Sequence, residues 1–468
     1  MTFAFLTPED FEKYISSWQL LPENPIKKEQ QRKSLLLAEL KKKDSAIAAI
    51  NAQYSLDPKI FNQQNLSTVP LEPFFYDTSD GKNPLINFYQ DLLRLQQNPI
   101  LMRILHYGDS QIENDRITSS FRSLMQEAFG GNGHGVLPLF QSDYKGYFDI
   151  KISSNWSVMS MRSNMRRGNY GLCNSYLYPP AINAIITQKN VDMGTVAISR
   201  ISAGKGLFLE ALLHEDVWVE KDFRVTAQKG TTTQNLTQSV KSENSFGLQH
   251  IVWKLPDSIT AINTSMSFLK NRNIYALSIN GKTGIVVDNL AIRGSLGDIF
   301  LKNNRRFLMD NYALMNVRLV VYEFGINALP QDGRPATEKD FEFYEKMLQQ
   351  ELGYLRITAP DVPVIVIGIS DRSYKNGLSW RTNPSVYYVR EIQRKVALEN
   401  GCVFWDLFNA MGGENSMQEW ASVKLGGKDF VHFTDKGAEL VGKMLYKALI
   451  DDYRKFVIKQ KQKEISAL

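Results

Sequence analysis

The apolar segment at residues 100–107 constrains the fold most, because it is typical of a buried strand and no similar segment follows it closely. It ends in the turn Gly108-Asp109-Ser110, and an amphipathic helical pattern covers residues 114–129. Comparable apolar segments occur much later, at 284–292, 317–324, 362–369 and 402–408. They alternate with helical patterns at 305–316, 338–356, 384–399 and 435–457. This alternation predicts an α/β fold with a parallel sheet buried on both faces. The first strand is therefore separated from the rest of its sheet.

The intervening residues 145–283 consist of short β-like segments between polar turns rich in Thr, Asn, Ser and Gly. We expect strands at 148–152, 195–198, 223–227, 248–253 and 274–279. Residues 229–244 are interpreted as a long polar loop. Many short strands with turn signals predict an antiparallel β-sandwich. We therefore expect a β-sandwich at 145–283, inserted into an α/β domain formed by 100–144 and 284–468.

Residues 1–99 form a third region, which we predict to be helical. Helical periodicity is clearest at 29–53 and at 83–97, where Asn83-Pro84 provides a start signal. This region is compatible with a packing collar or with a partner-binding arm.

Composition narrows the function classes. The 468 residues carry 43% hydrophobic and 22% charged side chains, which is typical of a soluble globular protein. The formal net charge is +6, but no dense Lys/Arg patch is interleaved with aromatics, so nucleic acid is not an expected partner. No apolar segment reaches transmembrane length.

The cysteines and histidines predict neither a disulfide framework nor a metal site. Cys173 and Cys402 are the two cysteines, and a pairing between them is left open. The five histidines are scattered and lack zinc-ligand spacing, so we predict no zinc site. The N-terminus has no recognisable secretion signal, which predicts either a cytoplasmic protein or a targeting segment removed beforehand.

Four strand-to-loop junctions of the predicted sheet carry residues with a chemical use. These are Ser110 after the first strand, Gly294 after residues 284–292, Asn327 in Gly325-Ile326-Asn327, and His432 in Asp429-Phe430-Val431-His432. The carboxyl ends of parallel strands lie at one edge of a sheet, where ligands bind. Each block alone also has a structural explanation as a turn or a cap, but their order and junction positions favour a joint catalytic role.

Ester cleavage by serine needs a base, a carboxylate that orients the base, and donors for the developing oxyanion. His432 is the candidate base, and Asp429 is the candidate carboxylate. The backbone N–H groups of Ser110 and Gly294 and the side-chain amide of Asn327 are the candidate oxyanion donors. Glycine suits the second position because it lets the backbone approach a substrate closely.

These four blocks resemble the signature of the SGNH (GDSL) hydrolase family, whose members have a flavodoxin-like sheet flanked by helices. The resemblance covers residues 100–140 and 284–450, and it implies Ser110 as nucleophile, Gly294 and Asn327 as oxyanion residues, and Asp429 with His432 as the acid and base. One departure is visible, since Ala328 follows Asn327 where the family often has aspartate.

More narrowly, the segments 105–110, 129–133 and 411–413 resemble the peptidoglycan O-acetylesterase group of bacterial envelope esterases. That group has a carbohydrate-binding-module-like β-sandwich inserted between the first two blocks. The resemblance implies removal of O-acetyl groups from polysaccharide, with no metal or cofactor, in the periplasm or cell envelope.

Three alternatives accompany this interpretation. The same acetyl-enzyme would support acetyl transfer to another sugar, which sequence does not separate from hydrolysis. A glycan-binding or scaffolding protein that retains a hydrolase fold is the alternative from another class, and Trp156, Trp218 and Trp253 could serve as its aromatic platforms. A long-chain lipase is disfavoured, because no Gly-x-Ser-x-Gly motif occurs.

Overall fold

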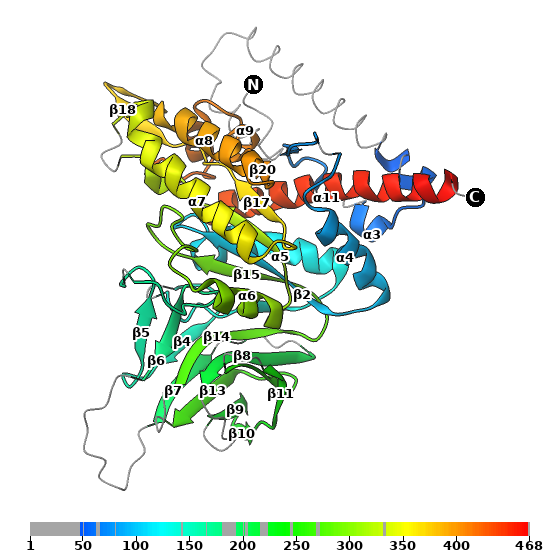
Figure 1. The fold of residues 1–468 in the computed structure, drawn as a ribbon, viewed down its shortest axis with the longest axis vertical. Coiled ribbons are helices and arrows are strands. Elements are labelled where there is room, and N and C mark those ends of the chain that lie inside the picture. Colours follow the sequence, from blue (N-terminus) through cyan, green and yellow to red (C-terminus); the bar gives the residue numbers. More distant parts are fainter. Residues whose placement is uncertain are drawn as a thin grey trace, which may run out of the picture.

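The computed structural model describes residues 47–466, apart from 50, 62–65, 80, 142–143, 165, 180–192, 200, 202–204, 216–222, 244–246, 268–271 and 331–333. In Figure 1 a parallel sheet with its helices forms the upper part of the molecule, and two antiparallel sheets form the lower part. Most of the helix predicted at 29–53, and the whole of residues 1–46, lie outside the described residues.

Five parallel strands form the sheet that the sequence predicted, in the spatial order β15-β2-β16-β17-β20. They are β2 (Leu101–Gly108), β15 (Gly284–Ala291), β16 (Val317–Glu323), β17 (Val364–Ile367) and β20 (Val403–Trp405). A short strand, β1 (Phe74–Phe75), adds antiparallel to β20 at the edge. The region expected to be helical thus also supplies one edge strand.

Both faces of this sheet are covered by helices, which explains why its strands are apolar throughout. One buried cluster contains Met102 and Ile104 of β2, and the cluster on the opposite face contains Leu105 and Tyr107. The first face is covered by α3 (Pro58–Phe61), α4 (Ile86–Gln97), α5 (Arg116–Phe129), α10 (Ser416–Ser422) and α11 (Asp435–Ser466). The second face is covered by α6 (Arg305–Leu314), α7 (Glu342–Thr358) and α8 (Ser385–Glu399).

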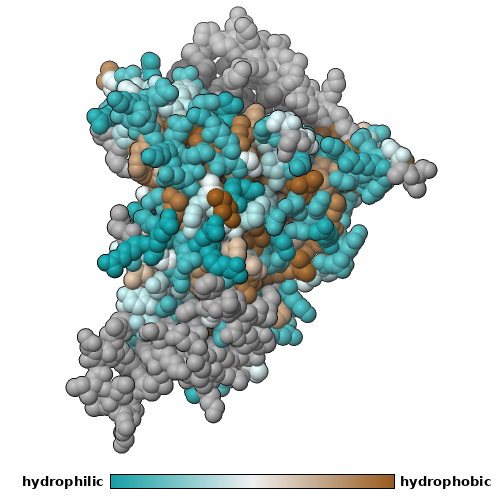
Figure 2. Space-filling view, viewed as in Figure 1, coloured by the Kyte–Doolittle hydropathy of each residue, from teal (hydrophilic) through white to brown (hydrophobic). Residues whose placement is uncertain are grey.

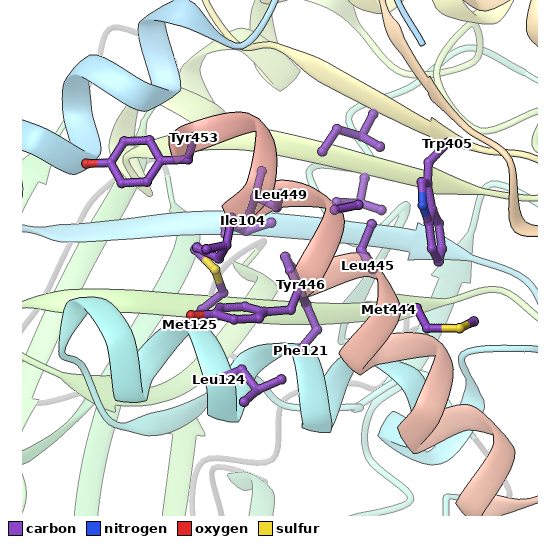
Figure 3. Packing of buried hydrophobic residues seen from close by; sticks show 14 of the residues in the cluster. Ile104, Phe121, Leu124, Met125, Trp405, Met444, Leu445, Tyr446, Leu449 and Tyr453 are labelled. Carbon is purple, nitrogen blue, oxygen red and sulfur yellow. The ribbon is translucent and has the colours of Figure 1, made fainter. Parts of the chain in front are cut away.

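The first cluster joins chain segments that are far apart in sequence. Figure 3 shows Phe121 of α5 and Leu445 of α11 in the same buried cluster as Ile104 of β2. Residues 51–61 and 85–95 contribute side chains to the same cluster. The described part of the N-terminal region therefore packs as a collar against the sheet.

The antiparallel strands lie between α5 and β15 in the chain. One sheet has the order β10-β9-β13-β7-β4, and the other has the order β11-β12-β8-β14-β6-β5, with β3 also paired to β14. Their bounds are β3 (Gly133–Val136), β4 (Asp149–Ile152), β5 (Ser157–Ser160), β6 (Ser175–Tyr178), β7 (Met193–Ser199), β8 (Leu207–Glu215), β9 (Phe223–Lys229), β10 (Thr232–Asn235), β11 (Gln238–Glu243), β12 (Leu248–Lys254), β13 (Ala261–Ser267) and β14 (Arg272–Gly281). Both sheets contribute to one buried cluster, which includes Val225 of β9 together with Leu209 and Leu213 of β8.

One sequence interpretation is wrong. Residues 229–244 were expected to form a polar loop, but they contain β10 and β11. β10 is exposed along its length and pairs only with β9, so it has no apolar face that a sequence pattern could reveal. Strands β3, β5, β6, β8 and β13 were also not anticipated.

Trp156 and Trp253 do not form the aromatic platforms that the glycan-binding alternative needs. Trp156 and Trp253 are only 7% and 1% exposed, because both pack in the cluster shared by the two antiparallel sheets. Trp218 lies outside the described residues. The two described tryptophans therefore serve the core of this region.

The remaining elements lie after β17. A two-stranded hairpin, β18 (Ser373–Asn376) with β19 (Ser379–Thr382), and the short helix α9 (Leu407–Ala410) were not anticipated. Cys173 and Cys402 are free thiols, so the pairing that the sequence left open does not occur. Within the described residues, every helix is too short or too polar to span a lipid bilayer.

Candidate active site

Ser110 lies two residues after the end of β2, in the turn that leads to α5. Its Oγ is 2.9 Å from Nε2 of His432. The carbonyl of Ser110 accepts a hydrogen bond from the Arg116 guanidinium, which also donates to the carbonyl of Phe433 at 3.0 Å. Arg116 thus ties the serine turn to the segment that carries His432.

A short turn holds His432 against Asp429. Oδ2 of Asp429 is 2.7 Å from Nδ1 of His432, and Oδ1 accepts the backbone N–H groups of Val431 and His432, both at 3.0 Å. Phe430 has a φ of +55°, which closes the turn. Burial raises the pKa of the Asp429 carboxyl, but the hydrogen bonds from His432 and Val431 outweigh it, so that the pKa lies below its usual value.

Gln111 connects the turn that carries Ser110 with the turn that carries His432. Its side-chain amide donates to the carbonyl of Val431 at 2.8 Å, and its backbone N–H donates to Oδ1 of Asp109 at 3.0 Å. Gln111 follows the serine directly, so one residue anchors the His432 turn to the end of β2.

Asn327 and Gly294 lie at the ends of the two strands that flank β2. The Asn327 amide nitrogen donates to Oδ2 of Asp109 and to the carbonyl of Ser295, both at 3.1 Å. Gly294 is exposed and has a φ of +69°, a conformation that favours glycine. The structure thus connects the first, second and third sequence blocks through Asp109, Ser295 and Asn327.

Asp109 is fully enclosed beneath this site. Burial raises its pKa to about 8, although the backbone N–H of Gln111 and the Asn327 amide oppose this effect by donating to the carboxyl. Asp109 is only 1% exposed, so it acts as an internal acceptor and not as a group that contacts solvent.

A buried polar network packs against the turn that carries Ser110. Nε2 of His106 is 2.9 Å from Glu323, and the Asn289 amide donates to Thr118 at 2.8 Å and to the carbonyl of Ile112 at 2.7 Å. His106 is fully buried, so its role is structural. Sequence reasoning missed this network, although polar residues within otherwise apolar strands were a visible signal.

Arg162 is a further residue that sequence reasoning missed. It comes from the β-rich region, its guanidinium donates to the carbonyl of Arg293, and a methyl group built on Gly294 would lie 3.6 Å from it. Arg293 in turn bonds Glu113, at 2.6 Å from Nε to the carboxylate. A cavity of about 200 Å³ lies here, lined by Glu113, Asn114, Arg162 and Arg293 among others.

No group of three or more His, Cys, Asp or Glu side chains in the described part of the chain is arranged to hold a metal ion. The groups at the site are a hydroxyl, an imidazole, a carboxylate and several N–H donors. Such an arrangement can perform nucleophilic acyl transfer with the residues of the chain alone.

Two comparisons with known proteins find similar proteins. Residues 257–440 match the model of the GDSL-like Lipase/Acylhydrolase family, a range that includes Gly294, Asn327, Asp429 and His432 but not Ser110. A search of curated proteins finds no match.

Among solved structures, a peptidoglycan O-acetylesterase superposes with a TM-score of 0.60 at 22% identity, over 82% of this chain and 100% of that one. An acetyl xylan esterase gives a TM-score of 0.28 at 21% identity, over 35% of this chain and 81% of that one. A salicylyl-acyltransferase from a tetracycline biosynthetic pathway gives 0.27 at 12% identity, over 67% and 95%. The family match and the fold shared with the O-acetylesterase show that the chain carries a GDSL-like lipase/acylhydrolase domain and is an esterase of the SGNH type.

Proposed function

We propose that the protein is a serine esterase that removes O-acetyl groups from a cell-envelope polysaccharide, with peptidoglycan as the favoured substrate. The observation that carries this proposal is the hydrogen-bonded series from Ser110 through His432 to Asp429, with distances of 2.9 Å and 2.7 Å. The fold shared with a peptidoglycan O-acetylesterase supports the choice of substrate. A cell-envelope location follows from that choice.

In the first step, Oγ of Ser110 attacks the acetyl carbonyl carbon while Nε2 of His432 accepts the hydroxyl proton. Asp429 holds Nδ1 of His432 and stabilises the imidazolium that forms. The tetrahedral intermediate then collapses, the bond to the sugar oxygen breaks, and His432 returns the proton to that oxygen. The products are a free sugar hydroxyl and acetyl-Ser110.

In the second step, His432 removes a proton from water, and the resulting hydroxide attacks acetyl-Ser110. As this intermediate collapses, the bond between the acetyl carbon and Oγ breaks and His432 returns the proton to Oγ, which releases acetate and restores the Ser110 hydroxyl. The backbone N–H groups of Ser110 and Gly294 and the Asn327 amide are the proposed donors to both oxyanions. The Asn327 amide nitrogen already donates to Asp109 and Ser295, so its donation to an oxyanion requires one of these bonds to be shared or released.

The domain organisation is also proposed. Across the sheet the five parallel strands lie in the order β15-β2-β16-β17-β20. Numbered by their order in the chain, this is 2-1-3-4-5, which supports a flavodoxin-like hydrolase domain. The buried cluster shared by the two antiparallel sheets supports an inserted β-sandwich. Because β3 pairs with β14, we place the start of the insertion near Gly130 and not at residue 145.

Hydrolysis of a chromogenic acetyl ester and of a longer-chain ester, with acetate release from O-acetylated peptidoglycan in parallel, tests this function. Ser110→Ala is expected to reduce turnover by at least about 10³-fold without changing the melting temperature. Ser123→Ala, which changes an exposed serine on α5, is the matched control and should retain activity. Full turnover by Ser110→Ala would disprove the assignment.

A further inference from the structure

Residues 161–164 and 166–170 of the β-rich region lie along the loop that follows β15. At one end Arg162 contacts the carbonyl of Arg293, beside Gly294. At the other end the N–H of Gly168 donates to the carbonyl of Lys302 at 2.9 Å, and the N–H of Asn304 donates to the carbonyl of Gly168 at 2.8 Å. This segment therefore connects the candidate active site with the start of α6.

A hollow of about 790 Å³ lies at the α6 end of this segment. Its lining includes Arg167, Tyr176, Asn273, Arg305 and Tyr354. These residues come from the β-rich region, from α6 and from α7. The hollow is separate from the Ser110 site and is not used by the proposed mechanism.

Two arginines give this hollow positive charge. Arg167 and Arg305 are exposed, and neither forms an ion pair with any carboxylate among the described residues. Their neighbour Arg306 differs, since it pairs with Asp310 at 3.5 Å. The N-terminus of α6 adds partial positive charge at the same place.

An aromatic surface stands beside these charges. The half-buried ring of Tyr176 lies 5.1 Å from the ring of Tyr275, which lies 4.9 Å from that of Phe307 on α6. Tyr275 and Phe307 are buried, so they hold Tyr176 in place. Figure 2 shows that the coloured part of the face in view is mostly hydrophilic, with apolar residues in small groups.

We propose that this hollow is a second glycan-binding site, which holds a negatively charged stretch of a sugar chain near the esterase site. A fixed aromatic ring can pack against a sugar ring, an amide such as Asn273 can bond its hydroxyl groups, and two guanidinium groups without a carboxylate partner can bind its carboxylates. The identification of this sugar chain as the substrate of the esterase rests on the proposed function. The proposal that the hollow binds a negatively charged glycan does not rest on it.

Co-sedimentation with purified peptidoglycan at increasing NaCl concentrations tests this proposal, together with turnover of a chromogenic acetyl ester. We expect Arg167→Ala and Arg305→Ala each to weaken sedimentation by about tenfold and to leave turnover of the small ester unchanged. Tyr176→Ala should weaken binding and Tyr176→Phe should retain it. Arg224→Ala, which removes an exposed charge from β9, is the matched control and should bind normally.

Equal sedimentation of Arg167→Ala and Arg224→Ala would overturn the proposal. So would equally strong, salt-insensitive binding to a neutral polysaccharide. If the wild type hydrolyses no ester but still sediments in an Arg167-dependent manner, the proposed function fails and the second site stands.

Discussion

Asp429 holds His432 through a side-chain hydrogen bond of 2.7 Å while its other oxygen accepts two backbone N–H groups of the same turn. This arrangement predicts the effect of Asp429→Asn. The amide oxygen would keep the two N–H groups, so the amide NH₂ would face Nδ1 of His432. That contact favours the tautomer with a proton on Nε2, which cannot accept the Ser110 proton. We expect kcat to fall by about 10⁴-fold.

Chromogenic acetyl ester turnover checks this prediction, and circular dichroism should show an unchanged fold. Asp435→Asn, which removes an exposed carboxylate from the first turn of α11, is the charge-matched control. A variant at Asp429 that kept more than about a tenth of wild-type kcat would contradict the orienting role.

Asp109 is expected to act on the reaction through Asn327. In Asp109→Asn, the amide oxygen would keep the backbone N–H of Gln111, and the NH₂ would face the Asn327 amide nitrogen, which lies 3.1 Å from Oδ2 in the wild type. Two donors would repel, and Asn327 would turn away. We expect kcat to fall by about 10- to 10²-fold with little change in KM.

A double-mutant cycle separates this route from a general structural effect. In an Asn327→Ala background, Asp109→Asn should cause little further loss of kcat, because the residue through which it acts is already absent. Additive losses would refute the coupling between the two side chains.

The parallel strands and the first three candidate blocks were visible in the sequence, because each apolar segment ends abruptly in polar or glycine residues such as Gly108-Asp109-Ser110. The fourth block, Asp429 to His432, was expected at a strand end but lies between α10 and α11. The strand β10 was not, since its exposed side chains give no apolar alternation. Arg162 was not predictable either, because its position beside Gly294 depends on how its segment packs against a loop more than a hundred positions later in the chain. The hydrogen bonds of Asn327 depend likewise on tertiary placement.

Glu351 predicts a pH dependence of stability. Its Oε2 accepts the backbone N–H groups of Ile299, Phe300 and Leu301, at 3.2, 2.6 and 3.3 Å, in the loop that follows Gly294. Burial raises its pKa from 4.5 to about 7 against the effect of these bonds. The folded state therefore binds the carboxyl proton of Glu351 more tightly than the unfolded state does. The stabilisation that results is present below about pH 4.5 and is lost as the pH rises through about 7.

Glu351→Gln keeps an acceptor for the loop and removes the titration. The free energy of unfolding of the variant relative to wild type should therefore increase between about pH 5 and about pH 8, by up to roughly 3 kcal/mol. Urea unfolding at several pH values measures this difference. A constant difference across the range would show that Glu351 does not titrate as described.

Arg103 and Asp288 form a buried ion pair that predicts a large loss of stability in Asp288→Ala. Asp288 accepts two bonds from Arg103, both at 2.9 Å, and one from the backbone N–H of Val136 at 2.7 Å. Both side chains have 0% exposure. Arg103 lies on β2 and also bonds Glu210 of β8, at 2.7 Å, so the pair joins the parallel sheet to the antiparallel region.

Removal of Asp288 would leave a buried guanidinium with less compensating charge and an unpaired backbone N–H. We expect the free energy of unfolding to fall by about 3–5 kcal/mol, measured by urea denaturation. Asp91→Ala is the surface control, because its partners Arg94 and Arg318 are 70% and 40% exposed, and it should cost less than about 1 kcal/mol. Similar losses in the two variants would mean that burial of the Arg103–Asp288 pair does not determine its contribution to the free energy of unfolding.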